Sequence, residues 1–121
     1  MSEIVQFEPR GRVGLITLNR PEARNAVNRA LAEGLEAAVD QLEADPQLWI
    51  GVLRANIEGQ NNPVFCAGAD LKALNDGAAG GTTQRGGFAG FVYRERKKPI
   101  IAAVDGLATA GGLEITLACD L

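Results

Sequence analysis

Residues 98–114, with the sequence KPIIAAVDGLATAGGLE, join an apolar run to small residues and then to a helix start. The apolar run, rich in Ile and Val, predicts a buried strand over residues 99–104. Small residues follow the strand, so a ligand can approach the backbone closely. The first N–H groups of a helix lack partners and favour negative charge, and Glu114 falls in the first helical turn. The stretch therefore predicts an anion-binding corner beside one carboxylate, with a plain packing corner as the alternative.

Two further segments have the same small-residue character. Residues 63–72, with the sequence PVFCAGADLK, again join an apolar run to a helix start, and Asp70 is a suitable N-cap for a helix beginning at Leu71. Residues 18–26, LNRPEARNA, follow a predicted strand over residues 13–18. In this order and spacing, the three segments resemble the crotonase superfamily of enoyl-CoA hydratases and isomerases over nearly the whole chain.

The rest of the chain alternates strands and helices. The predicted elements, in chain order, are a hairpin of strands over 4–7 and 13–18, a helix from an N-cap at Asn28 to about Ala44, a strand over 49–53, a polar turn over 56–63, a short helix over 70–74, a strand over 99–104 and a helix over 111–119. This alternation predicts an α/β fold with a largely parallel sheet. The resemblance implies a crotonase-like spiral of ββα units. Residues 1–121 would form its N-terminal part, so the spiral would be incomplete at the C-terminus.

Two stretches give weaker signals. Residues 77–90 contain six glycines without the Gly-Lys-Ser/Thr ending of a phosphate-binding loop, and we predict a flexible loop. In crotonase relatives this stretch is the variable wall over the acyl group, and residues 86–90 look like the corresponding part of carnitinyl-CoA dehydratases. The basic run over residues 94–98 is predicted to lie at a solvated helix C-terminus, with binding of CoA phosphates as the alternative.

Composition bounds the class of protein. The chain has 121 residues, of which 46% are hydrophobic and 22% charged, and a net charge of −3, which is typical of one soluble globular domain. No apolar run reaches the ~18 residues of a membrane span, the N-terminus lacks the pattern of a secretory signal, and the negative charge disfavours nucleic acid. We therefore expect a cytoplasmic protein with no nucleic-acid or membrane partner. Cys66 and Cys119 have no metal or redox spacing and are expected to be small buried hydrophobes.

The chain contains no histidine. This excludes Ser-His-Asp and Cys-His nucleophilic sites and every histidine-based metal site, so no metal is expected. Any proton transfer must then use carboxylates, Lys, Tyr or water.

The resemblance implies an oxyanion hole and an acid–base group. In the family, two backbone N–H groups bind the thioester oxygen, and they correspond here to those of Ala69 and Gly111. Glu114 matches the first of two glutamates that hold the water and move its proton, and the second belongs to a segment that would follow Leu121. Ala110 stands where many relatives have glycine.

Further residues match family positions that contact coenzyme A. Arg24 and Lys72 match cations near its phosphates, with a solvated surface cation as the alternative for each. The other substrate-binding residues that the resemblance implies are Ala26, Ala67, Asp70 and Leu71. The backbone at Ala67 and Leu71 would frame the adenine. Coenzyme A would be part of the substrate, so no separate cofactor is expected.

The implied function is an enoyl-CoA hydratase-like lyase that adds or removes water at the 2,3-bond of a CoA thioester. The alternatives are other crotonase-type chemistry, as in a carnitinyl-CoA dehydratase or an isomerase, and a catalytically inactive truncated product. Full-length family members are homo-oligomers, trimers or dimers of trimers. Because the second glutamate is absent, we expect the 121-residue chain alone to be inactive and prone to self-association.

Overall fold

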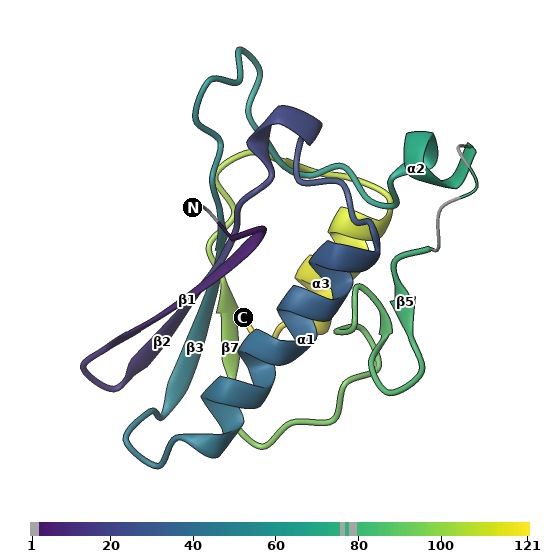
Figure 1. The fold of residues 1–121 in the computed structure, drawn as a ribbon. Coiled ribbons are helices and arrows are strands. Elements are labelled where there is room, and N and C mark those ends of the chain that lie inside the picture. The colour runs from purple at the N-terminus through teal and green to yellow at the C-terminus, as the bar shows by residue number, and fades with distance from the viewer. Residues whose placement is uncertain (1–2, 76, 78–79) are drawn as a thin grey trace.

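The computed structural model describes residues 3–75, 77 and 80–121. Its main sheet has four strands in the order β1-β2-β3-β7, which are Val5–Arg10, Val13–Leu18, Ile50–Ala55 and Ile100–Ala102 (Figure 1). β1 is antiparallel to β2, whereas β2 with β3 and β3 with β7 are parallel. The expected α/β fold with a largely parallel sheet is therefore confirmed. The N-terminal hairpin is longer than expected, because Gly11 makes the turn with a φ of +61°.

Helix α1 (Arg29–Ala44) covers one face of this sheet. The Asn28 side chain accepts a hydrogen bond from the Leu31 N–H at 2.9 Å, which confirms the expected N-cap. A Cβ built on Gly14 would lie 2.9 Å from Leu42 Cδ1, and one on Gly51 would lie 2.7 Å from Leu42 Cδ2. The helix can lie this close because the two strands below it carry glycine. Its buried face consists of Leu31, Ala32, Leu35, Ala38, Val39 and Leu42.

A group of short elements carries the candidate site. In chain order these are η1 (Pro21–Ala23), β4 (Val64–Cys66), α2 (Leu71–Asn75), β5 (Thr82–Thr83), β6 (Gly87–Phe88), β8 (Leu107–Ala108) and α3 (Gly111–Ala118). β4 pairs in parallel with β8, so the turns that lead to α2 and α3 leave from the same end of this pair. Phe65 and Ile115 are fully buried in the same apolar cluster as the inner face of α1. The core thus holds the two turns side by side.

The expectation of a flexible loop over residues 77–90 is wrong for its C-terminal part. β5 and β6 pair antiparallel, Thr82 with Phe88 and Thr83 with Gly87. Two-residue strands have no periodicity that a sequence could reveal, and this hairpin is ordered by α1, where the Thr83 hydroxyl donates to Glu36 Oε2 at 2.7 Å. Residues 78 and 79 of the stretch lie outside the described residues.

The expectation of a solvated helix C-terminus for the basic run before β7 is also wrong. The run does not follow a helix directly, because the last described element before it is β6 and residues 91–93 form a turn. Lys98 Nζ instead donates to the carbonyl oxygens of Leu42 and Asp45 at 2.7 and 2.6 Å, and so caps the C-terminal end of α1. Arg94 Nη2 lies 2.7 Å from Asp40 Oδ1. The partners of these cations are on a helix far away in the sequence, which is why the run alone misleads.

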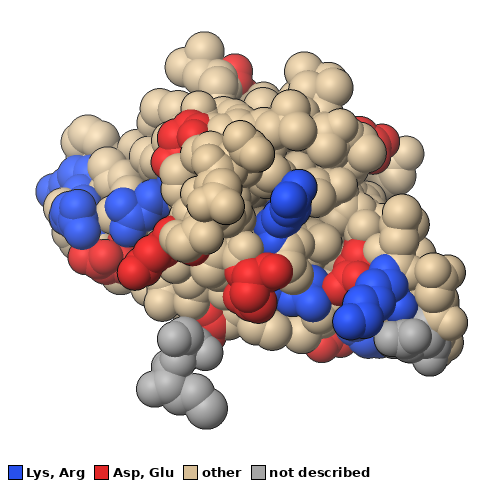
Figure 2. All heavy atoms as spheres, turned by 90° about the horizontal axis from the view of Figure 1, so that it is seen from above, with Lys and Arg blue, Asp and Glu red and all other residues tan. Residues whose placement is uncertain are grey.

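Two strand boundaries and the surface complete the description. β3 begins after Trp49, which is 64% exposed and lies under the guanidinium of Arg12, and β7 ends at Ala102 rather than at 104. Basic and acidic side chains are interspersed on the face that Figure 2 shows. None of the helices in the described part of the chain is long and apolar enough to cross a membrane.

Candidate active site

The two small-residue turns touch each other at Gly68 and Gly111. A Cβ built on Gly68 would lie 2.8 Å from the Gly111 nitrogen, and one built on Gly111 would lie 3.2 Å from Gly68 Cα. Gly68 also has a φ of +93°, in the left-handed region that favours glycine. Both the contact and the backbone conformation therefore require glycine at position 68.

The backbone donors at this contact are open. The N–H groups of Ala69 and Gly111 donate no hydrogen bond to any residue that the structure describes. Ala69 faces Val27 in an isolated parallel bridge, but the bonds of that bridge run from the Val27 N–H to Gly68 O at 2.7 Å and from the Asp70 N–H to Val27 O at 2.9 Å. Gly111 is the first residue of α3, where N–H groups lack helical partners. Two open donors in neighbouring turns can bind one oxygen that carries negative charge.

Ala110, the N-cap of α3, has a strained backbone. Its φ is +49° and its ψ −121°, a conformation that L residues other than glycine rarely adopt. Such strain costs about 1–3 kcal/mol and is held by the surrounding structure, commonly at functional sites. The strain lies directly before the open Gly111 N–H, so it sets the direction of that donor.

Glu114 lies in the first turn of α3, and its own N–H donates to the Ala110 carbonyl at 3.1 Å. The residue is exposed, and its carboxylate makes no hydrogen bond or ion pair with a described side chain. A carboxylate with no partner, one helical turn from an open donor, is available for proton transfer.

An ion pair joins the segment of residues 18–26 to the segment of residues 63–72. Arg20 Nη1 lies 2.9 Å from Asp70 Oδ2 and donates to the Ala26 carbonyl at 2.6 Å. Asp70 Oδ1 accepts from the Ala73 N–H at 2.9 Å, which confirms Asp70 as the N-cap of α2. The hydrogen bond from the Ala73 N–H, together with Arg20, holds the pKa of Asp70 below its usual value. Both carboxylate oxygens are thus used within the fold, and sequence reasoning missed the role of Arg20.

A buried asparagine fixes the loop that carries the predicted CoA contacts. Asn25 is fully buried with a φ of +55°; its Oδ1 accepts from the Arg20 N–H at 2.8 Å and its Nδ2 donates to Asn56 O at 3.1 Å. The Ala67 N–H donates to the Arg24 carbonyl at 3.1 Å. The structure therefore brings the segment around Arg24 and Ala26 against the segment that begins at Ala67.

The exposed cations of these two segments, Arg24 and Lys72, are free to bind a ligand. Arg24, Leu71 and Lys72 are exposed, and neither cation forms an ion pair with a described carboxylate. Ala26, Ala67 and Asp70 are partly buried in the same two segments, and the segment that holds Ala67 and Asp70 also carries Gly68.

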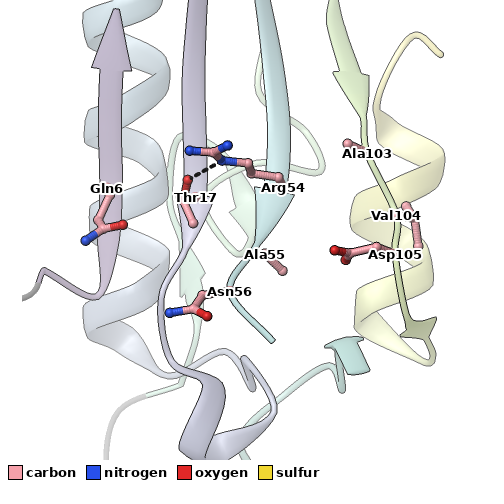
Figure 3. Close-up of a pocket in the computed structure, with 8 residues that line it drawn as sticks. All are labelled: Gln6, Thr17, Arg54, Ala55, Asn56, Ala103, Val104 and Asp105. Carbon is pink, nitrogen blue, oxygen red and sulfur yellow. Dashed lines mark hydrogen bonds between the residues drawn. The ribbon is translucent and has the colours of Figure 1, made fainter. Parts of the chain in front are cut away.

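A separate hollow of about 590 Å³ lies on the sheet face away from α1 (Figure 3). Arg54 Nε donates there to the Thr17 hydroxyl at 2.9 Å. Its lining residues are Gln6, Thr17, Arg54, Ala55, Asn56, Ala103, Val104 and Asp105. None of them belongs to the predicted site, so this hollow is distinct from the open donors.

The environment of both cysteines disfavours the thiolate form. Burial raises the pKa of the Cys66 thiol, and it raises that of Cys119 to about 11. Cys66 is buried as predicted, whereas Cys119 is only partly buried. Among the described residues, no group of three or more acidic or thiol side chains could hold a metal ion.

The sheet, its covering helix and the two paired turns define the class: this is part of a crotonase-type α/β fold. Residues 8–121 match the family model for enoyl-CoA hydratase/isomerase, and the chain belongs to this family.

Individual relatives agree with this assignment. The chain is 41% identical to the mevalonyl-coenzyme A hydratase SIDH of Beauveria bassiana, a match over 93% of this chain and 42% of that protein. The structure of a probable enoyl-CoA hydratase/isomerase from Mycobacterium abscessus is 50% identical, with a TM-score of 0.86 over 100% of this chain and 45% of the other. The carnitinyl-CoA hydratase from Mycobacterium avium is 41% identical, with a TM-score of 0.87 over 100% and 46%. The chain thus spans less than half the length of these relatives.

Proposed function

We propose that this chain binds a 2-enoyl-CoA thioester and that the N–H groups of Ala69 and Gly111 stabilise its oxygen. When water adds to carbon 3, the electrons of the double bond move toward the thioester carbonyl, and carbon 2 then takes a proton. The negative charge that develops on the oxygen is the charge that two fixed donors stabilise, and losing one such donor costs about 3 kcal/mol. The observation that carries the proposal is the pair of open N–H groups at the Gly68–Gly111 contact.

Glu114 is proposed to orient the water and exchange its proton. Support comes from its unpartnered carboxylate in the first turn of the helix that begins with the Gly111 donor. By resemblance, a second glutamate beyond residue 121 would share this task. In a chain without histidine, a carboxylate is one of the few side chains that can transfer a proton, beside Lys, Tyr and water.

The CoA moiety is proposed to lie along the surface formed by residues 18–26 and 63–72. Arg24 and Lys72, two cations without carboxylate partners among the described residues, would bind its phosphates. The backbone at Ala67 and Leu71 would frame the adenine, and Ala26 and the peptide of Asp70 would complete the surface. The side chain of Asp70 is held by Arg20, so it would act by shaping this surface.

More than one acyl group is a candidate for the substrate. The relatives include a mevalonyl-CoA hydratase and a carnitinyl-CoA hydratase, whose names give different acyl groups. A carnitinyl-CoA dehydratase would use the same donors for removal of water, and this is our second candidate. A trimer or dimer of trimers and a cytoplasmic location stay predictions from the resemblance and the composition.

The direct test is a structure of the protein with an acyl-CoA, combined with a hydration assay on a short 2-enoyl-CoA. The thioester oxygen should lie within hydrogen-bond distance of both the Ala69 and the Gly111 nitrogen. An oxygen bound elsewhere, or no loss of the conjugated thioester absorbance with the full-length protein, would refute the proposal.

A further inference from the structure

The hairpin of β5 and β6 places an aromatic ring on the candidate oxyanion site. A Cβ built on Gly111 would lie only 2.5 Å from Phe88 Cε2, so the ring lies directly against the start of α3. Phe88 is partly buried, and its neighbours Ala89 and Phe91 are fully buried in the core. Any shift of this hairpin therefore moves the ring that borders the Gly111 donor.

The opposite side of the hairpin is held on α1 by charged groups. Arg85 Nη2 lies 2.9 Å from Asp40 Oδ2 and 3.4 Å from Glu36 Oε1. Arg94 Nη2 lies 2.7 Å from Asp40 Oδ1, and its side chain is only 9% exposed. The Thr83 hydroxyl donates to Glu36 Oε2 at 2.7 Å. We call these five residues the charge latch.

The hairpin is held in two ways: Ala89 and Phe91 after β6 are buried in the core, and the charge latch fixes its strands on α1. Its two strands have two residues each, and an isolated pair of this length is not stable in water. Figure 1 shows the hairpin beside α1, on the side of the helix away from the main sheet. Asp40 bonds both Arg85, between the strands, and Arg94, after them, and so fixes the hairpin at both of its ends.

We propose that Glu36 and Asp40 are positioning residues for acyl-group selectivity, which they control by holding Phe88 against Gly111 through the charge latch. This inference rests on the proposed function, because the space that Phe88 limits is the space beside the thioester oxygen. With the latch closed, the ring limits the room for a long acyl chain. With the latch open, the ring withdraws and a longer chain fits.

The test compares Asp40→Asn with Glu33→Gln in the full-length protein. Glu33 pairs with Arg29 on the same helix at 3.1 Å and borders the hairpin, but it makes no hydrogen bond or ion pair with a described residue of the hairpin, so its loss removes a charge and an ion pair of α1 without breaking the charge latch. The first measurement is hydrogen exchange of residues 82–93. The second is the ratio of affinities for dodecanoyl-CoA and butanoyl-CoA.

Asp40→Asn should speed exchange in residues 82–93 about tenfold, as for a segment that opens locally. It should also raise the dodecanoyl to butanoyl affinity ratio about tenfold, the size of effect that a change in an apolar pocket produces. Asp40→Glu, which keeps the charge, should largely restore both, and Glu33→Gln should change neither.

Unchanged exchange in Asp40→Asn would overturn the latch, and faster exchange with an unchanged affinity ratio would overturn its role in selectivity. If the unmodified protein bound neither CoA thioester, the proposed function would fail and the selectivity role with it. The exchange measurement would still report on the latch alone, so the two failures are distinguishable.

Discussion

Replacing Gly68 with alanine tests the contact that forms the candidate site. The substitution has two effects that can be separated. Alanine must adopt the φ of +93°, and its methyl carbon would lie 2.8 Å from the Gly111 nitrogen. Gly59 provides the control, because it has a φ of +81° and no atom within 4 Å of an added Cβ.

The two magnitudes follow from these geometries. A left-handed conformation costs an L residue about 1–2 kcal/mol, and this is the whole cost expected for Gly59→Ala. Overpacking against a neighbour that cannot move freely adds about 1–3 kcal/mol, so Gly68→Ala should lower the free energy of unfolding by about 2–5 kcal/mol. The methyl group would also cover the Gly111 N–H, and the loss of one oxyanion donor should lower kcat by about 10²-fold.

Urea unfolding of both variants, together with turnover of a short 2-enoyl-CoA by the full-length protein, measures these effects. Gly59→Ala should lose a little stability and keep its kcat. The reasoning is refuted if Gly68→Ala is no less stable than Gly59→Ala and turns over at the same rate, because the two turns would then not meet at an open donor.

Four further outcomes are expected. Glu114→Gln in the full-length protein should lower kcat by ~10²-fold or more and leave binding of acyl-CoA largely unchanged, measured by steady-state kinetics and calorimetry. Ala110→Gly should raise the free energy of unfolding by about 1 kcal/mol in a urea titration, because glycine adopts this backbone conformation without strain. The folded-state pKa of Asp70 is lowered, so the charged carboxylate stabilises the folded protein at pH values above the unfolded-state pKa of about 3.9. This stabilisation is lost as the pH falls through the folded-state pKa. In thermal melts across this pH range, Asp70→Asn should therefore be less stable than the wild type near neutral pH and approach it in acid. Residues 1–121 expressed alone should self-associate in light scattering and show no hydration of a 2-enoyl-CoA, because side chains such as Leu117 (74% exposed) leave apolar surface uncovered.

The main elements of the fold could be predicted because their signals are local. The Asn28 cap, the helix that runs from it to Ala44 and the Asp70 cap are each set by residues close together in the sequence, and the structure confirms all three. Strand β7 and helix α3 were also expected, and their observed boundaries differ from the expected ones by one or two residues. Tertiary hydrogen bonding, which a local pattern does not contain, decides such boundaries.

The parts that could not be predicted depend on partners far away in the chain. The hairpin around Phe88 was expected as a flexible loop, and the basic run containing Arg94 was expected at a solvated helix end. Both are ordered by carboxylates on α1, and nothing in their own composition indicates this. The contact between Gly68 and Gly111 likewise follows from the pairing of β4 with β8. Only the resemblance indicated that these two turns share one site.

Three of the four non-glycine residues with positive φ in the described part of the chain lie in the turns around the open donors, and the fourth, Ala89, follows β6. Arg24, Asn25, Gly68 and Ala110 all have φ between +49° and +93°, and all lie in the three turns that meet at the candidate site. Strained residues persist only where the surrounding structure over-determines them. Here the support is polar: Asn25 is buried with its amide bonded on both sides, and Arg20 ties the first turn to the second. Since each buried polar group in this network has its partners, the network can hold the turns without the cost of an unpaired group. The rigidity that a pair of backbone donors needs therefore comes from Arg20 and Asn25, which touch neither donor.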